Sequence, residues 1–89
     1  MLYPIAVEIG DKNHAYGVVV PDIAGCYSAG DSMDDAIAQA KEAINGHLEL
    51  LAEMGELPPE AKPLDYWFQN PEFSGWAWAL VEIDIEPYM

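Results

Sequence analysis

Val18–Gly55 reads VVVPDIAGCYSAGDSMDDAIAQAKEAINGHLELLAEMG, and this stretch decides the fold. Its β-branched start predicts a strand that ends at Pro21, because proline cannot donate a hydrogen bond to a central ladder. Ser32 comes three residues before Asp35, which is the spacing of a helix N-cap with an acidic partner. Over Met33–Met54 the apolar residues then recur at helical intervals along one face. The stretch therefore predicts a strand, a turn, a short extended piece and a long amphipathic helix.

Two glycines bear on this helix, one at its end and one in its interior. Gly55 follows its last turn and predicts a left-handed C-terminal cap, and Pro58 and Pro59 prevent the helix from continuing. Gly46 weakens the helix interior by about 1 kcal/mol relative to alanine. We interpret Gly46 as a position of close packing, because a residue without Cβ lets a neighbouring segment approach.

The rest of the chain predicts strands on both sides of the helix. Leu2–Ile9 alternates between apolar and mixed positions, which predicts a half-buried strand. A tight turn joins it to a second strand over Ala15–Val20, and Cys26–Ala29 adds a third. After the helix, Asp65–Gln69 predicts one short helical turn and Trp76–Glu86 predicts the last strand. The fold class is therefore α+β, with a three-stranded antiparallel meander, a long helix, a short helix and a final strand on one sheet.

The alternation also assigns faces. In the first strand the inward side chains are expected to be Tyr3, Ile5, Val7 and Ile9. In the last strand a uniformly apolar face should carry the long helix; its members are Ala77, Ala79, Val81, Ile83 and Ile85. The opposite face is half aromatic and half acidic and contains Trp76 and Trp78. Such a face predicts an interaction platform. The alternative is that Tyr66–Phe68 folds back over the two tryptophans.

Length and composition indicate a single domain, which we expect to span residues 1–89, with a hydrophobic content of 52%. The lone cysteine, Cys26, makes no internal disulfide, which is typical of a reducing compartment. No stretch approaches the roughly 18 apolar residues of a membrane span, and the N-terminus lacks the basic and apolar regions of a signal peptide. We therefore expect a cytoplasmic protein that does not contact a membrane.

Charge is the strongest compositional signal. Sixteen acids face three lysines and no arginine, which gives a formal net charge of −13. Direct binding to nucleic acid needs cations that neutralise phosphates, so this composition argues against it. The acidity predicts a basic protein partner attracted over a long range, or else it serves solubility alone.

Residues that would indicate an enzyme are few. There is no glycine-rich phosphate loop and no Cys/His spacing typical of zinc, so we expect no metal and no cofactor. A catalytic pair of Cys26 with His14 or His47 is conceivable, but a small buried strand cysteine is the better interpretation. Carboxylates at strand ends would bind two divalent ions for phosphodiester cleavage if they converged. The candidates for such a cluster are Glu8, Asp22, Asp31 and Glu82.

Several short motifs follow one another in a specific order. They are Tyr3-Pro4, Tyr16-Gly17-Val18, Val20–Cys26, Ser28–Ser32, the helical positions Ala36, Ala40, Ala43-Ile44 and His47-Leu48, and Gly55-Glu56-Leu57-Pro58. In combination they resemble the HicB-type antitoxin family over most of the chain. The resemblance implies a partial RNase H-like fold with the order β-β-β-α-α-β, which is the order predicted above from the residues.

The resemblance also implies a role as the non-enzymatic antitoxin domain of a type II toxin–antitoxin system, binding and masking a small basic HicA-type mRNA interferase. Such proteins usually carry a C-terminal DNA-binding module, and we expect none within this chain because it ends right after the last strand. For contact with the toxin we name acids and apolar anchors: Glu8, Asp22, Asp31, Trp76 and Trp78.

Two alternatives remain open. One is a degenerate or active RNase H-like metal-dependent nuclease that uses the four carboxylates named above. The other is a module that oligomerises an attached DNA-binding domain, through the free edge of the last strand or the tryptophan face. We also expect the chain to form a homo-oligomer.

Overall fold

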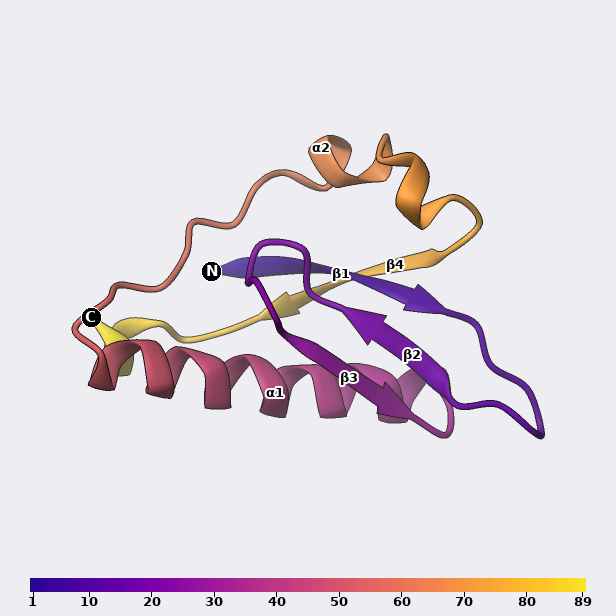
Figure 1. Cartoon of the computed structure of the whole chain (residues 1–89), viewed down its shortest axis with the longest axis horizontal. Coiled ribbons are helices and arrows are strands. Elements are labelled where there is room, and N and C mark those ends of the chain that lie inside the picture. Colours follow the sequence, from indigo (N-terminus) through magenta and orange to yellow (C-terminus); the bar gives the residue numbers. More distant parts are fainter.

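The computed structural model describes the whole chain, Met1–Met89. Its strands are β1 (Leu2–Glu8), β2 (Tyr16–Val19), β3 (Tyr27–Gly30) and β4 (Ala77–Glu82). Its helices are α1 (Met33–Glu53) and α2 (Leu64–Phe68), with short 3₁₀ turns η1 (Pro71–Phe73) and η2 (Glu86–Tyr88). Figure 1 shows α1 along one side of the sheet and α2 on the other. The predicted α+β fold and its element order are confirmed.

The four strands form one antiparallel sheet in the order β3-β2-β1-β4. β1, β2 and β3 make the predicted meander, and β4 returns after α1 to pair with β1 (Figure 1). The first strand is therefore central, while β3 and β4 are the two edges. None of the helices combines the length and the apolar character needed to cross a membrane.

Both predicted ends of α1 are confirmed. The hydroxyl of Ser32 accepts a hydrogen bond of 3.1 Å from the backbone N–H of Asp35. The carboxylate of Asp35 accepts in return from the N–H of Asp31, at 2.9 Å, so the reciprocal bond lies one residue before the cap. At the other end Gly55 has a φ of +79° and the N–H of Glu56 donates to Leu51 O at 2.8 Å. This is a Schellman-type termination, which needs a glycine in the left-handed region.

The interpretation of Gly46 is wrong. A Cβ at Gly46 would meet no atom within 4 Å, and the residue is exposed on α1. The close approach occurs at Gly30 instead, where a Cβ would collide with the backbone of Ala36 in the first turn of the helix. A glycine is thus required where β3 passes the start of α1, and Gly46 has no packing role.

The core lies between α1 and one face of the sheet. The helix buries a stripe along its inner face, formed by Ala36, Ala40, Ile44 and Leu48. The sheet contributes Tyr3, Ile5, Val7, Val18 and Val81, and Ile83 just after β4 adds to them; all are at most 4% exposed. Ala77, Ala79 and Ile85 pack against this cluster as predicted for the apolar face of the last strand. Burial of this apolar surface is the main stabilising term for a domain without disulfides.

β1 is not the half-buried strand that its alternation predicts. Pro4 and Ala6, on the face expected to be exposed, are buried as well, whereas Ile9 is 56% exposed. The reason is the position of β1 in the middle of the sheet, where the face opposite α1 is also covered. Ile9 lies beyond the end of β1 and so has no inward face to occupy.

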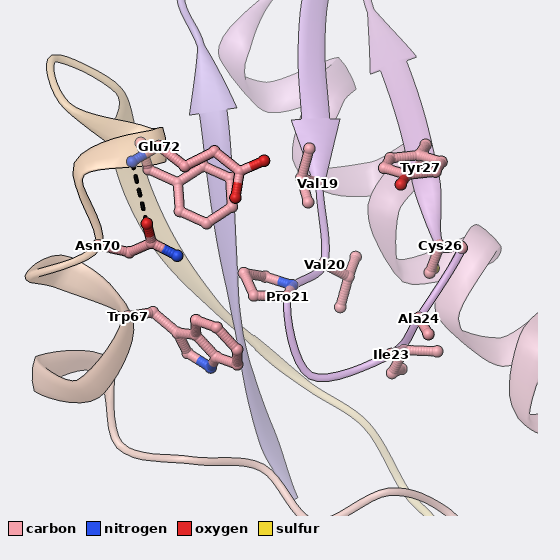
Figure 2. Close-up of a pocket in the computed structure, with 12 residues that line it drawn as sticks. Val19, Val20, Pro21, Ile23, Ala24, Cys26, Tyr27, Trp67, Asn70 and Glu72 are labelled. Carbon is pink, nitrogen blue, oxygen red and sulfur yellow. Dashed lines mark hydrogen bonds between the residues drawn. The ribbon is translucent and has the colours of Figure 1, made fainter.

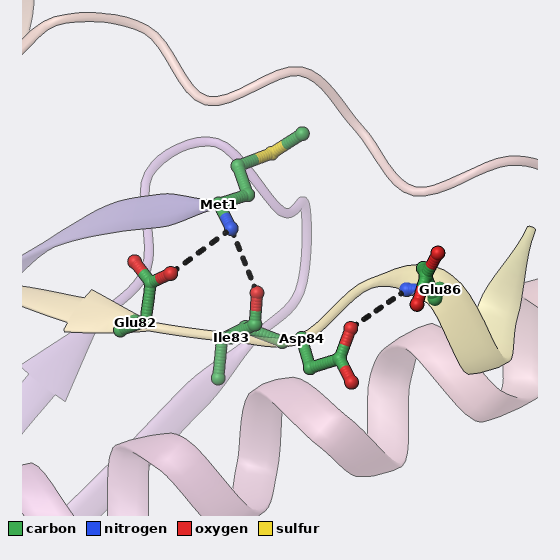
Figure 3. Close-up of polar contacts among 5 residues, drawn as sticks. All are labelled: Met1, Glu82, Ile83, Asp84 and Glu86. Carbon is green, nitrogen blue, oxygen red and sulfur yellow. Dashed lines mark hydrogen bonds and ion pairs between the residues drawn. The ribbon is translucent and has the colours of Figure 1, made fainter.

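β4 is shorter than the predicted Trp76–Glu86 because its pairing with β1 ends where β1 begins. Leu2 pairs with Glu82, and the N-terminal amine of Met1 donates to Ile83 O at 2.8 Å (Figure 3). The same amine lies 3.7 Å from a carboxylate oxygen of Glu82. Beyond that point the chain turns into η2, which contains Pro87 and cannot continue a ladder.

Candidate functional site

The sheet face opposite α1 carries a row of side chains that crosses all four strands. Ala6 pairs with Trp78 on one side and with Val19 on the other, and Val19 pairs with Tyr27. Residues directly opposite each other in neighbouring strands project from the same face of a sheet. We call this set the outer row. Ala6 is buried, Trp78 and Val19 are half-buried, and Tyr27 is 68% exposed.

Phe73 covers the β4 end of the outer row. Its ring packs edge-on against Trp76 and Trp78, with centroid separations of 5.3 and 5.5 Å. Aromatic pairs favour this geometry, and Phe73 itself is buried. The tryptophans are thus folded over, but by η1 and not by Tyr66–Phe68. Both remain half-buried, so each still presents part of its surface.

Asp22 lies in the turn between β2 and β3 and binds the segment that leads into α2. Its Oδ1 accepts hydrogen bonds of 3.1 Å from the indole N–H of Trp67 and from the backbone N–H of Lys62. The ammonium of Lys62 lies 5.9 Å from the centre of the Trp67 ring, within cation–π range. Asp22 Oδ2 is buried and has no hydrogen-bond partner. The acid named from the sequence for toxin contact therefore first serves to position Trp67.

Tyr3 binds the segment between α1 and α2 at a second point. Its hydroxyl donates to Pro59 O at 2.6 Å. Burial, and secondly the charge of Asp22, raise the pKa of Tyr3, so the neutral phenol that donates this bond is favoured. The irregular segment after α1 is thus anchored across the sheet by one core tyrosine and one turn aspartate.

A cavity of about 210 Å³ opens between the β2–β3 turn and the α2–η1 segment. Figure 2 shows Trp67 on one side of it, Val19 and Pro21 at its back and Tyr27 on the far side. Asn70 and Glu72 supply its polar groups. Small-molecule sites occupy roughly 300–1,000 Å³. The cavity is smaller than that and has the size of a pocket for a single side chain.

The remaining predicted acids are spread over the molecule. Glu8 ends β1 opposite Gly17 of β2, whereas Glu82 of β4 lies beside the other end of β1, opposite Leu2. Leu2 and Glu8 are six residue steps apart along β1, or about 20 Å at strand rise. Asp31 is exposed just before the N-cap of α1 and lines a shallow polar hollow beside the Asp11–His14 turn.

The carboxylates considered for a nuclease centre therefore do not converge. No three side chains among the histidines, cysteine and acids are placed to hold a metal ion. Two-metal cleavage requires carboxylates that share ions about 4 Å apart. The alternative of a metal site built from Glu8, Asp22, Asp31 and Glu82 is therefore not supported, because these acids lie at opposite ends of the sheet and in an internally bonded turn.

Cys26 is also not arranged as a nucleophile. It is 1% exposed, and burial raises the pKa of its thiol. A raised pKa lowers the thiolate fraction on which nucleophilicity depends. His14 is engaged instead with Asp11, Nδ1 to Oδ1 at 2.9 Å, and this bond lowers the pKa of the Asp11 carboxyl. Cys26 is a core residue, as interpreted from the sequence.

Sequence reasoning did not single out the residues that form the cavity, above all Tyr27, Glu72 and Phe73. One local signal was available. Asn70 precedes Pro71, and its side chain accepts from the Glu72 N–H at 2.9 Å, which is an Asx turn readable from Asn-Pro-Glu. That signal predicts the turn, but not that the turn lies over the sheet.

Comparison with known proteins gives consistent relatives. The sequence profile of one family, HicB_like antitoxin of bacterial toxin-antitoxin system, matches residues 3–89. An uncharacterized 14.9 kDa protein in the rep-hol intergenic region of Haemophilus phage HP1 (strain HP1c1) is 39% identical over 89 residues. The matched residues cover 100% of this chain and 65% of the phage protein, so the chain spans slightly less than two thirds of that relative.

Two solved structures share the fold. The N-terminal domain of Burkholderia pseudomallei antitoxin HicB is 44% identical with a TM-score of 0.83, over 94% of this chain and 99% of that one. A chain of the HicA3 and HicB3 toxin-antitoxin complex is 31% identical with a TM-score of 0.79, again over 94% and 99%.

Proposed function

The chain belongs to the HicB-like antitoxin family, and from this premise we propose that it binds a small basic HicA-type mRNA interferase and masks the surface that holds RNA. The proposed action is non-enzymatic and takes place in the cytoplasm, a reducing compartment in which an unpaired thiol stays reduced. A 31% identical chain in the HicA3 and HicB3 toxin-antitoxin complex supports a toxin of this type as the partner.

The observation that carries the proposal is the state of the carboxylates. Of the sixteen acids, only Asp11 and Glu82 have a cationic partner within 4.0 Å, one a histidine and the other the N-terminal amine. None of the three lysines forms an ion pair with an acid. The negative charge is thus not neutralised within the fold. A basic RNA-binding surface would complement it and would be drawn in at long range.

We assign the contacts to the sheet face opposite α1 and its rim. Glu8 and Asp31 are exposed acids near the hairpin end. Trp78 on β4 and Trp76 just before that strand offer half-buried aromatic surface. Asp22 acts through the segment that it holds. Acids on the solvent side of α1, such as Glu42 and Glu49, lie across the sheet from this face and are not part of the assignment.

An RNA-cleavage assay tests this function. A HicA-type toxin mixed with an excess of the chain should lose its cleavage of mRNA. The double variant E8Q/D31N should inhibit less well than E42Q/E49Q, which removes the same two charges from α1. Undiminished cleavage in the presence of excess wild-type chain would overturn the proposal. Equal inhibition by the two double variants would leave the antitoxin role and remove the assignment of Glu8 and Asp31.

A second candidate function is oligomerisation, which the edge position of β4 favours. β4 pairs only with β1, so its other side presents unpaired backbone groups, and Leu80 on it is 48% exposed. Such an edge can pair with the same strand of another copy. Sedimentation velocity over a range of concentrations should show a dimer; a monomer at every concentration would exclude this candidate.

A further inference from the structure

The cavity between the β2–β3 turn and the α2–η1 segment has an apolar lining and one carboxylate, that of Glu72, which forms no ion pair. Its walls include Val19, Pro21 and the rings of Tyr27, Trp67 and Phe73. Glu72 is exposed, has no cationic partner and extends its carboxylate over the cavity toward β2 (Figure 2). A long apolar stem and an aromatic-stacking cation would satisfy both parts of such a site.

Arginine is the side chain with that combination. Its aliphatic stem buries against apolar surface, and its planar guanidinium stacks on aromatic rings and bonds a carboxylate through two N–H groups. Lysine lacks the planar fork. The chain has no arginine of its own, so the occupant must come from a partner. The net charge of −13 favours a basic partner over an acidic one.

We infer that this cavity receives one arginine side chain of the bound toxin, with Glu72 as its carboxylate partner and Tyr27 and Trp67 as its aromatic walls. The inference rests on the proposed antitoxin function and assigns its central anchor. Interfaces draw most of their affinity from a few such anchors in desolvated pockets, and arginine is prominent among them.

The cavity is held open by bonds already in place. Trp67 is fixed at its indole N–H by Asp22, and the turn that carries Glu72 is fixed by Asn70. Neither Trp67 nor the turn that carries Glu72 needs to be ordered when the partner binds, which lowers the entropic cost of association. Asp22 is thus a positioning residue for the cavity.

Surface plasmon resonance with an inactivated HicA-type toxin tests the assignment. E72Q and Tyr27→Ala should each raise Kd by about tenfold or more, chiefly through faster dissociation, because they remove groups from a desolvated contact. The matched control E42Q removes the same charge from the far side of the molecule and should change Kd by less than about twofold. Both Glu72 and Tyr27 are exposed, so neither substitution endangers the fold.

A double-mutant cycle identifies the arginine of the toxin that contacts Glu72. Each arginine of the toxin is replaced by alanine and tested against wild-type chain and E72Q. One arginine should abolish the effect of E72Q when it is replaced, whereas the others should leave that effect unchanged. If E72Q and Tyr27→Ala bind as tightly as wild type, or if no arginine couples to Glu72, the inference is overturned while the antitoxin function stands.

A toxin-free measurement separates the two proposals. Titration with N-acetyl-arginine amide should shift the NMR signal of the Trp67 indole N–H in the wild-type chain and not in E72Q. N-acetyl-citrulline amide, a neutral analogue of the same shape, should have no effect. If the toxin fails to bind, this arm still decides the cavity: a shift with arginine alone supports it, and equal responses to both compounds refute it.

Discussion

The indole N–H of Trp67 donates a hydrogen bond to Oδ1 of Asp22, 45 positions earlier in the chain, at 3.1 Å. This bond joins the β2–β3 turn to α2 and sets the width of the cavity between them. The same carboxylate oxygen also accepts from the Lys62 N–H. One acid thus connects the β2–β3 turn to the segment that leads into α2, two parts of the chain separated by β3 and α1.

Asp22→Ala should therefore destabilise the fold by about 1–3 kcal/mol, because the part-buried indole N–H of Trp67 and the backbone N–H of Lys62 both lose their acceptor. Asp22→Asn keeps a carbonyl oxygen in the same place and should cost less. Urea unfolding followed by circular dichroism measures both. A similar loss in the two variants would mean that the charge of Asp22 matters and the hydrogen bonds do not.

Gly46→Ala should stabilise the protein by about 1 kcal/mol, since alanine has the higher helix propensity and the site is open. The midpoint of urea unfolding should rise without a change in slope.

Gly30→Ala is the matched control, because the added Cβ is the same. At Gly30 it would collide with the backbone of Ala36, so the midpoint should fall. A rise in both variants would show that β3 and the start of α1 separate more easily than their packing indicates.

Stability should decline in alkaline solution. Burial raises the pKa of Cys26 above 9.0 and that of Tyr3 above 10.0, and both groups are neutral when protonated. Such groups contribute stability that is complete below the unfolded-state pKa and is lost as the pH rises through the folded-state value. The free energy of unfolding should therefore fall as the pH rises past 9.0 and then 10.0.

Cys26→Ala provides the comparison for the thiol. Its unfolding free energy should depend less on pH near 9.0 than that of the wild type. In the folded wild type the thiol should also react with Ellman's reagent only after urea is added. Rapid reaction without urea would contradict the burial of Cys26.

Toxin association should depend steeply on salt if unpaired carboxylates steer the encounter. The association rate should fall as ionic strength rises, since screening shortens the reach of charges to about 8 Å at physiological strength. Asp31→Asn should mainly lower the association rate, and Trp78→Ala should mainly raise the dissociation rate. Stopped-flow mixing at several salt concentrations measures these rates. An association rate that barely changes with salt would assign recognition to the apolar face alone.

Local chemistry was readable in advance. The caps of α1 depend on residues next to each other in sequence, so Ser32, Asp35 and Gly55 predict its ends correctly. The apolar face of β4 follows from simple alternation. By contrast, the alternation of β1 predicts one exposed face, and Pro4 and Ala6 are buried because a distant segment covers them. The predicted close packing at Gly46 is wrong for a related reason, since the distance between two segments depends on the tertiary structure.

The main helices and strands, their order, the acidic charge and the family are therefore readable from the amino-acid sequence. Three features depend on long-range contacts: β4 lies beside β1, Phe73 covers Trp76 and Trp78, and Asp22 holds Trp67. Helix caps and strand periods are set by interactions within a few residues. A cavity is set by contacts between segments 40 and 45 positions apart in the chain, and these exist only after the core has fixed the sheet against α1.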